Sequence, residues 1–152
     1  MVPLVVVCLL LLTMGVPALN TALKQKTPVD SEVAAFIWMR DNLARDAKVI
    51  APLEEGHLVT YYAQRKNMID DQFYLVNDIE QRYKENIDLF TTPFQTYALG
   101  LAEKYQAQYI VVTPFTQQKY GLSQLRYYTI ECLERVYRKD TLIYKLKCTL
   151  QK

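Results

Sequence analysis

The chain has 152 residues, with 18 basic and 16 acidic side chains, and its formal net charge is +2. The charges are spread along the chain and form no basic stripe, which argues against nucleic acid as a partner. Charge runs are absent and glycine and proline are few, so the composition is not that of a disordered protein.

The first 19 residues form an unbroken apolar segment without a charged side chain. A helix needs about 20 apolar residues to span a bilayer, so residues 1–19 are predicted to form a transmembrane helix. Three interpretations stay open: a signal peptide, a lone anchor, and the last span of a polytopic protein. A signal peptide would carry N-terminal positive charges, which are missing here. For a lone anchor, Lys24 and Lys26 would place the domain in the cytoplasm.

A polar linker at residues 20–27 separates this segment from the rest of the chain. Residues 28–152 are predicted to form one soluble domain of ordinary size. Thr27 followed by Pro28 is typical of a helix start, and apolar residues at helical spacing extend this helix to about Ala44.

Short apolar runs then alternate with amphipathic stretches. The run Tyr109–Val112 is the clearest strand, because its continuous β-branched residues suit a strand covered on both faces. The elements predicted after the first helix are a strand at 48–52, a short helix at 57–63, a strand at 67–70, helices at 77–90 and 92–105, a strand at 109–113, a helix at 122–138 and a strand at 141–148.

This order of elements predicts an α/β fold. We expect a small three-layer domain with a mostly parallel sheet of about four strands and flanking helices, preceded by one transmembrane helix.

Three cysteines do not make a disulfide framework. Cys8 lies in the apolar segment, Cys132 in a predicted helix and Cys148 in the last predicted strand. A bridge between the last two requires Cα atoms within about 7 Å of each other. We interpret both as buried thiols, which leaves the cellular compartment undecided.

Acidic side chains follow the first two predicted strands, and the only histidine lies between them. Loops at the carboxyl ends of parallel strands line the crevice where ligands bind. Glu54, His57 and Asp70 would there form a site for a divalent cation or a sugar hydroxyl. The competing interpretation is that these are ordinary polar loop residues and helix caps.

Recognisable catalytic motifs are absent. The sequence has no nucleophile elbow, no glycine-rich phosphate loop and no cysteine or histidine pair with metal-ligand spacing, so we assign no catalytic residue. Two tyrosine doublets, Tyr61–Tyr62 and Tyr127–Tyr128, fall in predicted helices. Adjacent helical positions point about 100° apart, so only one tyrosine of each doublet can face the core.

Several segments together resemble a known family. An apolar span precedes the helix Phe36–Asn42, a glycine turn follows at Gly56, and Tyr61–Arg65, Asp70–Asp71 and Tyr109–Val112 come in turn. The pattern resembles the extracytoplasmic C-terminal domain of C-superfamily membrane glycosyltransferases. That superfamily includes protein mannosyltransferase-like enzymes and the oligosaccharyltransferase catalytic subunit.

In oligosaccharyltransferases a Trp-Trp-Asp-Tyr-Gly motif after the first strand reads the acceptor sequon. The matching stretch here is Pro52–Gly56, in which only the glycine and the acid Glu54 correspond. Both tryptophans are missing, so recognition of a peptide sequon does not follow. The family's catalytic carboxylates lie in loops between earlier membrane spans, which this chain does not contain.

The resemblance implies an extracytoplasmic cap and acceptor-recognition domain of a polyprenyl-phosphate-sugar-dependent membrane glycosyltransferase, without its catalytic transmembrane part. Its partners would be membrane lipid, the remaining transmembrane part, and a glycan or protein acceptor. No cofactor is expected in this chain, and a divalent cation would belong to the complete enzyme. The alternative is a stand-alone anchored or secreted binding module without activity. The expected substrate-binding residues are Glu54, Gly56, His57, Arg65, Asp70 and Asp71.

Overall fold

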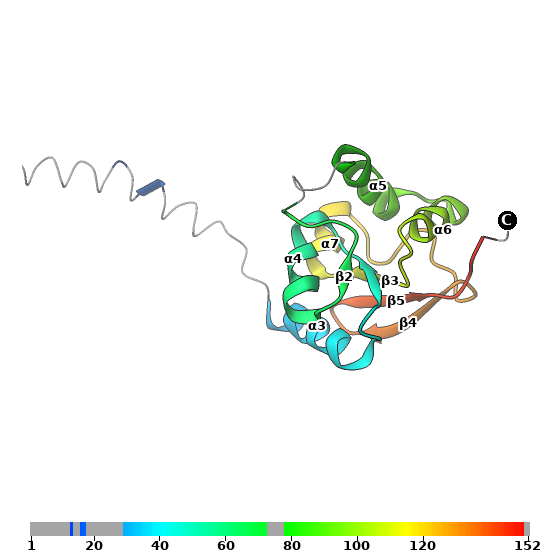
Figure 1. Ribbon diagram of the computed structural model, residues 1–152, viewed down its shortest axis with the longest axis horizontal. Coiled ribbons are helices and arrows are strands. Elements are labelled where there is room, and N and C mark those ends of the chain that lie inside the picture. The colour runs from blue at the N-terminus through cyan, green and yellow to red at the C-terminus, as the bar shows by residue number, and fades with distance from the viewer. Residues whose placement is uncertain (1–12, 14–15, 18–28, 73–77, 151–152) are drawn as a thin grey trace, which may run out of the picture.

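A computed structural model describes residues 13, 16–17, 29–72 and 78–150. Residues 29–150 contain the sheet and its covering helices (Figure 1). Within the described residues, no helix has the length and apolar character needed to cross a membrane. The predicted linker and most of the predicted transmembrane segment lie outside the described residues, so those two predictions stay untested.

The sheet has five strands in the order β2–β1–β3–β5–β4. Strand β1 (Lys48–Ile50) runs parallel to both β2 (Lys66–Asn67) and β3 (Tyr109–Val112). Strand β5 (Leu142–Leu146) runs antiparallel to both β3 and β4 (Leu133–Arg138). The expectation of a mostly parallel sheet of about four strands was therefore wrong. The short turn between β4 and β5 permits only antiparallel pairing, because a parallel connection needs a long crossover.

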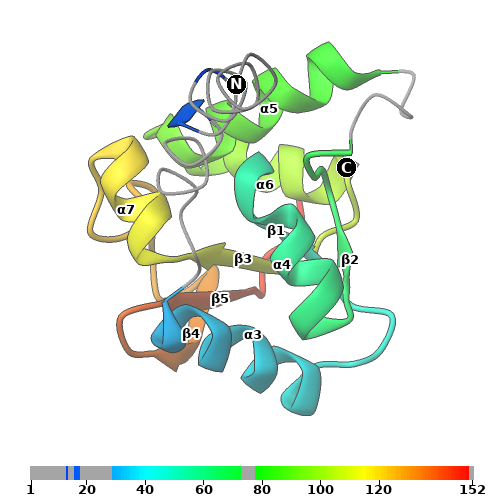
Figure 2. The same cartoon turned by 90° about the vertical axis from the view of Figure 1, so that its left-hand side faces the viewer.

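Helices cover both faces of the sheet. Helix α3 (Asp30–Asn42) packs on one face, and helices α5 (Ile79–Thr91) and α6 (Gln95–Lys104) pack on the other (Figure 2). In β1, β3 and β5, successive residues alternate between the two cores, as the pleat requires. In β3, for example, Val111 belongs to the core beneath α3, whereas Ile110 belongs to the core beneath α5 and α6. Buried on both faces, β3 is the central strand that the sequence predicts.

A continuous helical segment follows β1. It consists of η2 (Leu53–Glu55), α4 (Gly56–Leu58) and η3 (Val59–Ala63), and it ends where Gln64 adopts a left-handed conformation with φ 51°. The helix predicted at residues 57–63 is thus confirmed, and it begins four residues earlier.

The helix predicted at 122–138 was wrong. Its last six residues form β4, which pairs with β5, and residues 121–132 contain no helix or strand. The apolar spacing in this stretch fits a helix locally, but pairing with β5 satisfies the backbone hydrogen bonds and buries Leu133 and Tyr137.

Helix α7 (Pro114–Tyr120) was not predicted. Its start carries the threonine–proline signal used elsewhere in the chain, since Thr113 caps the helix by accepting a 3.1 Å hydrogen bond from the Thr116 backbone N–H. Gly121 ends the helix at φ 61°.

Cys132 and Cys148 form a disulfide, with their Cα atoms 4.8 Å apart. The interpretation as two buried thiols was therefore wrong. The register of the β4–β5 hairpin aligns Leu133 with Leu146, which brings the two flanking cysteines together. Disulfides persist in oxidising compartments and are rare in the cytosol. The bridge therefore indicates an extracytoplasmic domain.

Candidate functional site

A groove lies beside the α4–η3 segment and the loop that follows β2. Its volume is about 600 Å³, and its lining includes His57, Tyr61, Asp70 and Asp71. His57 Nδ1 lies 4.0 Å from Asp71 Oδ2, and both side chains are more than half exposed. The structure therefore brings together His57, Asp70 and Asp71, three of the six predicted binding residues.

Gly56 explains how these groups meet. A Cβ added at Gly56 would lie 2.2 Å from the carbonyl oxygen of Ile69 and 2.7 Å from the Cα of Asp70. Only a residue without a side chain lets the loop after β2 cross α4 at this distance. Gly56 therefore positions Asp70 and Asp71 beside His57.

Glu54 points elsewhere. Its carboxylate accepts hydrogen bonds of 2.7 and 2.9 Å from Lys119 Nζ on α7. The structure thus separates Glu54 from His57 and Asp70, with which it was expected to form a site. In the described part of the chain, no three His, Cys, Asp or Glu side chains converge as a metal ion requires.

The neighbouring Glu55 is buried at 4% exposure. Its carboxylate accepts hydrogen bonds from the Thr113 hydroxyl at 2.7 Å and from the Thr116 hydroxyl at 3.1 Å. These bonds tie η2 to the start of α7, so Glu55 stabilises the end of the sheet where β1 and β3 terminate.

Arg65 is buried at 7% exposure and faces the backbone. Its guanidinium donates to the carbonyl oxygens of Arg40 at 2.7 Å and Leu43 at 2.6 Å, where α3 ends. Two further bonds reach the carbonyls of Ala63 and Gln64. Carbonyl groups at a helix end lack partners within the helix, and a cation there also complements the helix dipole. The geometry thus gives Arg65 a structural role, and a binding role for it stays a prediction.

The groove also contains residues that sequence reasoning missed: Thr60, Gln64 and Gln72. Tyr61 was noticed only as part of a doublet. Tyr61 is 74% exposed, whereas Tyr62 packs on the core, and their ring centroids are 4.9 Å apart in an edge-to-face arrangement. The doublet is the signal that marks Tyr61 as an exposed aromatic side chain.

These groups suit the binding of a polar ligand. An imidazole, two carboxylates and two amides supply hydrogen-bond donors and acceptors around an exposed aromatic ring. The Thr60 hydroxyl donates to the carbonyl oxygen of Gly56 at 3.3 Å, so it is held towards the backbone rather than towards His57. No nucleophile activated by a base is visible among the groove residues.

The fold is similar to that of a globular domain whose structure has been solved. The C-terminal globular domain of the oligosaccharyltransferase AfAglB-S2 from Archaeoglobus fulgidus superposes with a TM-score of 0.60 at 15% sequence identity. The match covers 80% of this chain and 100% of that domain. The resemblance inferred from the sequence is thus confirmed at the level of the fold.

Two structures of a larger A. fulgidus oligosaccharyltransferase also match. One is tethered to an acceptor peptide containing the NVT sequon, with a TM-score of 0.49 and 17% identity, and the other is a complex with Zn and sulfate, with a TM-score of 0.48 and 17% identity. Each covers 59% of this chain, which spans only 14% and 15% of those proteins. No protein-family model and no curated protein matches the chain.

Proposed function

We propose that this chain is the C-terminal extracytoplasmic domain of a polyprenyl-phosphate-sugar-dependent membrane glycosyltransferase, where it covers the active site and recognises the acceptor. The observation that carries the proposal is the superposition on the whole C-terminal globular domain of an archaeal oligosaccharyltransferase. The Cys132–Cys148 disulfide supports the extracytoplasmic location. The apolar segment 1–19 would serve as the last membrane span before the domain.

The acceptor, a glycan or a protein, would bind in the groove beside α4. His57, Asp70 and Asp71 would hydrogen-bond its polar groups, and the exposed ring of Tyr61 would stack on a sugar ring or an apolar side chain. Gly56 and Arg65 would act indirectly, by fixing the backbone around the groove. Binding by Glu54 would require it to leave Lys119.

The catalytic part of the enzyme would lie in other membrane spans. Mass analysis of the native product from its source membranes, detected with an antibody against residues 78–150, tests this directly. We expect a species several times larger than 17.7 kDa, or a stable complex with a polytopic membrane protein. A product of 17.7 kDa without such a partner would contradict the proposal and favour a stand-alone anchored binding module.

A second experiment tests the groove. Binding of two probes to the purified full chain, an Asn-Val-Thr peptide and the disaccharide mannobiose, is measured by saturation-transfer NMR. We expect at least one of the two probes to bind. His57→Gln and Asp71→Asn should each weaken the affinity for that probe about tenfold, as expected for the loss of a hydrogen bond to a charged group. Asp140→Asn, an exposed change in the β4–β5 turn, is the matched control. Equal binding by all three variants would remove the groove from acceptor recognition.

A further inference from the structure

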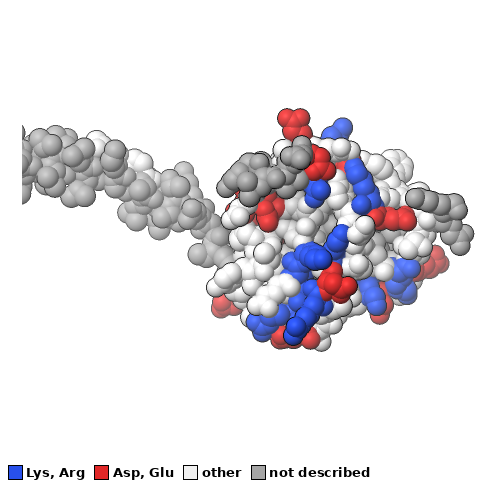
Figure 3. All heavy atoms as spheres, viewed as in Figure 1, with Lys and Arg blue, Asp and Glu red and all other residues white. Residues whose placement is uncertain are grey.

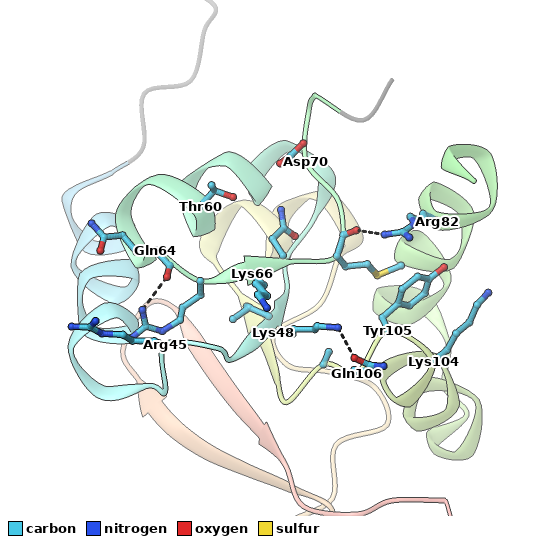
Figure 4. A pocket seen from close by; sticks show the side chains of 15 residues that line it. Arg45, Lys48, Thr60, Gln64, Lys66, Asp70, Arg82, Lys104, Tyr105 and Gln106 are labelled. Carbon is cyan, nitrogen blue, oxygen red and sulfur yellow. Dashed lines mark hydrogen bonds between the residues drawn. The ribbon is translucent and has the colours of Figure 1, made fainter. Parts of the chain in front are cut away.

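A second, larger cavity lies along the open edge of the sheet at β2. Its volume is about 730 Å³, within the range of about 300 to 1,000 Å³ that small-molecule sites occupy. It adjoins the groove described above, since Thr60, Gln64 and Asp70 line both. Its remaining wall comes from the start of β1, from β2, and from α5, α6 and the turn after α6 (Figure 4).

The cavity is strongly basic. Six of its lining residues are cations and only one, Asp70, is a carboxylate. Figure 3 shows basic side chains running across the face on which β2 lies. The six cations are Arg45, Lys48, Arg65, Lys66, Arg82 and Lys104.

Three of these cations already have partners. Arg82 Nε lies 2.8 Å from Asp78 Oδ1, and Lys104 Nζ lies 2.7 Å from Glu85 Oε1. The guanidinium of Arg65 is bound to backbone carbonyls. Carboxylates therefore balance the charges of Arg82 and Lys104, whereas Arg65 donates its hydrogen bonds to neutral carbonyl groups.

The other three cations have no carboxylate partner among the described residues. Lys48 Nζ donates to the neutral Gln106 side chain at 2.6 Å. Arg45 and Lys66 make no ion pair with any described residue, and Asp70 is the only acid in the cavity wall. An excess of positive charge is therefore concentrated inside the cavity.

Lys48 and Lys66 are direct register partners on the parallel strands β1 and β2. Partners in register carry their side chains on the same face, so the two lysine side chains leave the sheet next to each other. Like charges in this arrangement repel and destabilise a strand pair. A bound anion would offset that repulsion, because it attracts both ammonium groups.

Lysines at a sheet edge also have a purely structural use, because charges there prevent pairing with another chain. Of the strands β1 and β2, only β2 lies at an edge of the sheet and needs such protection. Lys48 lies on β1, which is covered by β2 on one side and by β3 on the other, so edge protection does not account for it.

We propose that this cavity binds the phosphate group of a small polar ester, with the Lys48 and Lys66 ammonium groups as its ligands. Arg and Lys are the side chains that recognise phosphate through charge-assisted hydrogen bonds. The volume leaves room for the esterified group, and the amides of Gln64 and Gln106 offer it hydrogen bonds. The proposal does not depend on acceptor recognition in the adjoining groove.

Calorimetric titration of the purified full chain with glycerol phosphate tests the site. A titration with sodium chloride at the same ionic strength is the reference. We expect binding to the natural chain, and a loss of about tenfold or more in Lys48→Gln/Lys66→Gln, because each lysine donates to a charged acceptor. Lys84→Gln/Lys145→Gln makes the same change of charge outside the cavity. An equal loss in both double variants, or no binding to the natural chain, would overturn the proposal.

A vesicle experiment distinguishes a soluble ester from a lipid headgroup. Binding of the full chain to phosphatidylcholine vesicles is compared with and without phosphatidylglycerol. A gain with the anionic lipid that disappears in Lys48→Gln/Lys66→Gln identifies a headgroup as the source. Binding of glycerol phosphate without such a gain identifies a soluble ester. His57→Gln, which tests the groove, should leave both measurements unchanged, so failure of one site is separable from failure of the other.

Discussion

The Cα of Gly56 lies so close to the carbonyl oxygen of Ile69 that an added Cβ would be 2.2 Å from it. This contact fixes the loop after β2 over α4. Gly56→Ala should lower the free energy of unfolding by about 1–3 kcal/mol, because backbone atoms on both sides would have to move.

Chemical denaturation measures this effect, and Gly100→Ala in α6 is its control. A Cβ at Gly100 meets only the end of the Leu150 side chain, at 3.3 Å. Alanine is favoured over glycine inside a helix by about 1 kcal/mol, so the control should be neutral or stabilising. If both variants were equally stable, the close crossing at Gly56 would not exist in solution.

Repulsion between Lys48 and Lys66 predicts that removing one of the two charges stabilises the folded chain. Lys66→Gln should raise the free energy of unfolding by about 0.2–1 kcal/mol, the range for cross-strand pairs. The gain should shrink as salt is added, since screening weakens repulsion between exposed charges. Urea denaturation at low and high salt measures it, with Lys84→Gln as the control. A destabilised Lys66→Gln chain would show that the two charges do not repel.

Glu85 makes stability depend on pH. Burial raises the pKa of its carboxyl, but hydrogen bonds from Lys104, Tyr105 and Gln81 oppose this and leave the pKa below its ordinary value of 4.5. The unfolded chain therefore binds this proton more readily than the folded one. The resulting stabilisation is fully present above the unfolded-state pKa and is lost as the pH falls through the folded-state pKa.

The variant Glu85→Gln isolates this contribution. Its free energy of unfolding should lie below that of the natural chain by a constant amount above about pH 5, and the two curves should converge at lower pH. Urea denaturation across this range measures both. A difference independent of pH would mean that the carboxylate is not the stabilising form.

The Cys132–Cys148 bridge closes a loop with a sequence separation of 16 residues. Cys148→Ala should lower the free energy of unfolding by about 3 kcal/mol, the value for a loop of this length. Mass spectrometry after alkylation checks the bridge itself: both cysteines should be labelled only after reduction. Labelling of Cys132 without reductant would contradict the disulfide.

Residues 133–138 were predicted to be helical but form a strand, so the local sequence pattern was not sufficient to predict their structure. Leu125, Leu133 and Val136 have a spacing that favours a helix, yet Leu133–Arg138 is a strand. The deciding interactions are hydrogen bonds to β5, and no property of the segment alone reports them. The disulfide was missed for the same reason, because it depends on the register of that hairpin.

The two cavities differ in how far the sequence could predict them. The groove beside α4 was partly predictable, since His57, Asp70 and Asp71 follow strands whose carboxyl ends meet at one edge. The basic cavity was not, because its cations are dispersed from Arg45 to Lys104 and each appears as an isolated surface charge in the sequence. Glu54 was misplaced because its partner Lys119 lies on α7, a helix that was not predicted.

The turn expected at Gly56 is helical in the structure, where Gly56 begins α4. The sequence by itself determined the α/β class and the strand at Tyr109–Val112, together with the resemblance that the superposition confirms at the level of the fold. These features follow from hydrophobic periodicity and backbone preference, which act over a few neighbouring residues. Only the tertiary structure decided the β4–β5 hairpin, the disulfide and the meeting of Lys48 with Lys66. Each of these depends on which strands pair and in which register, and burial and strand pairing select such contacts only once the whole chain has folded.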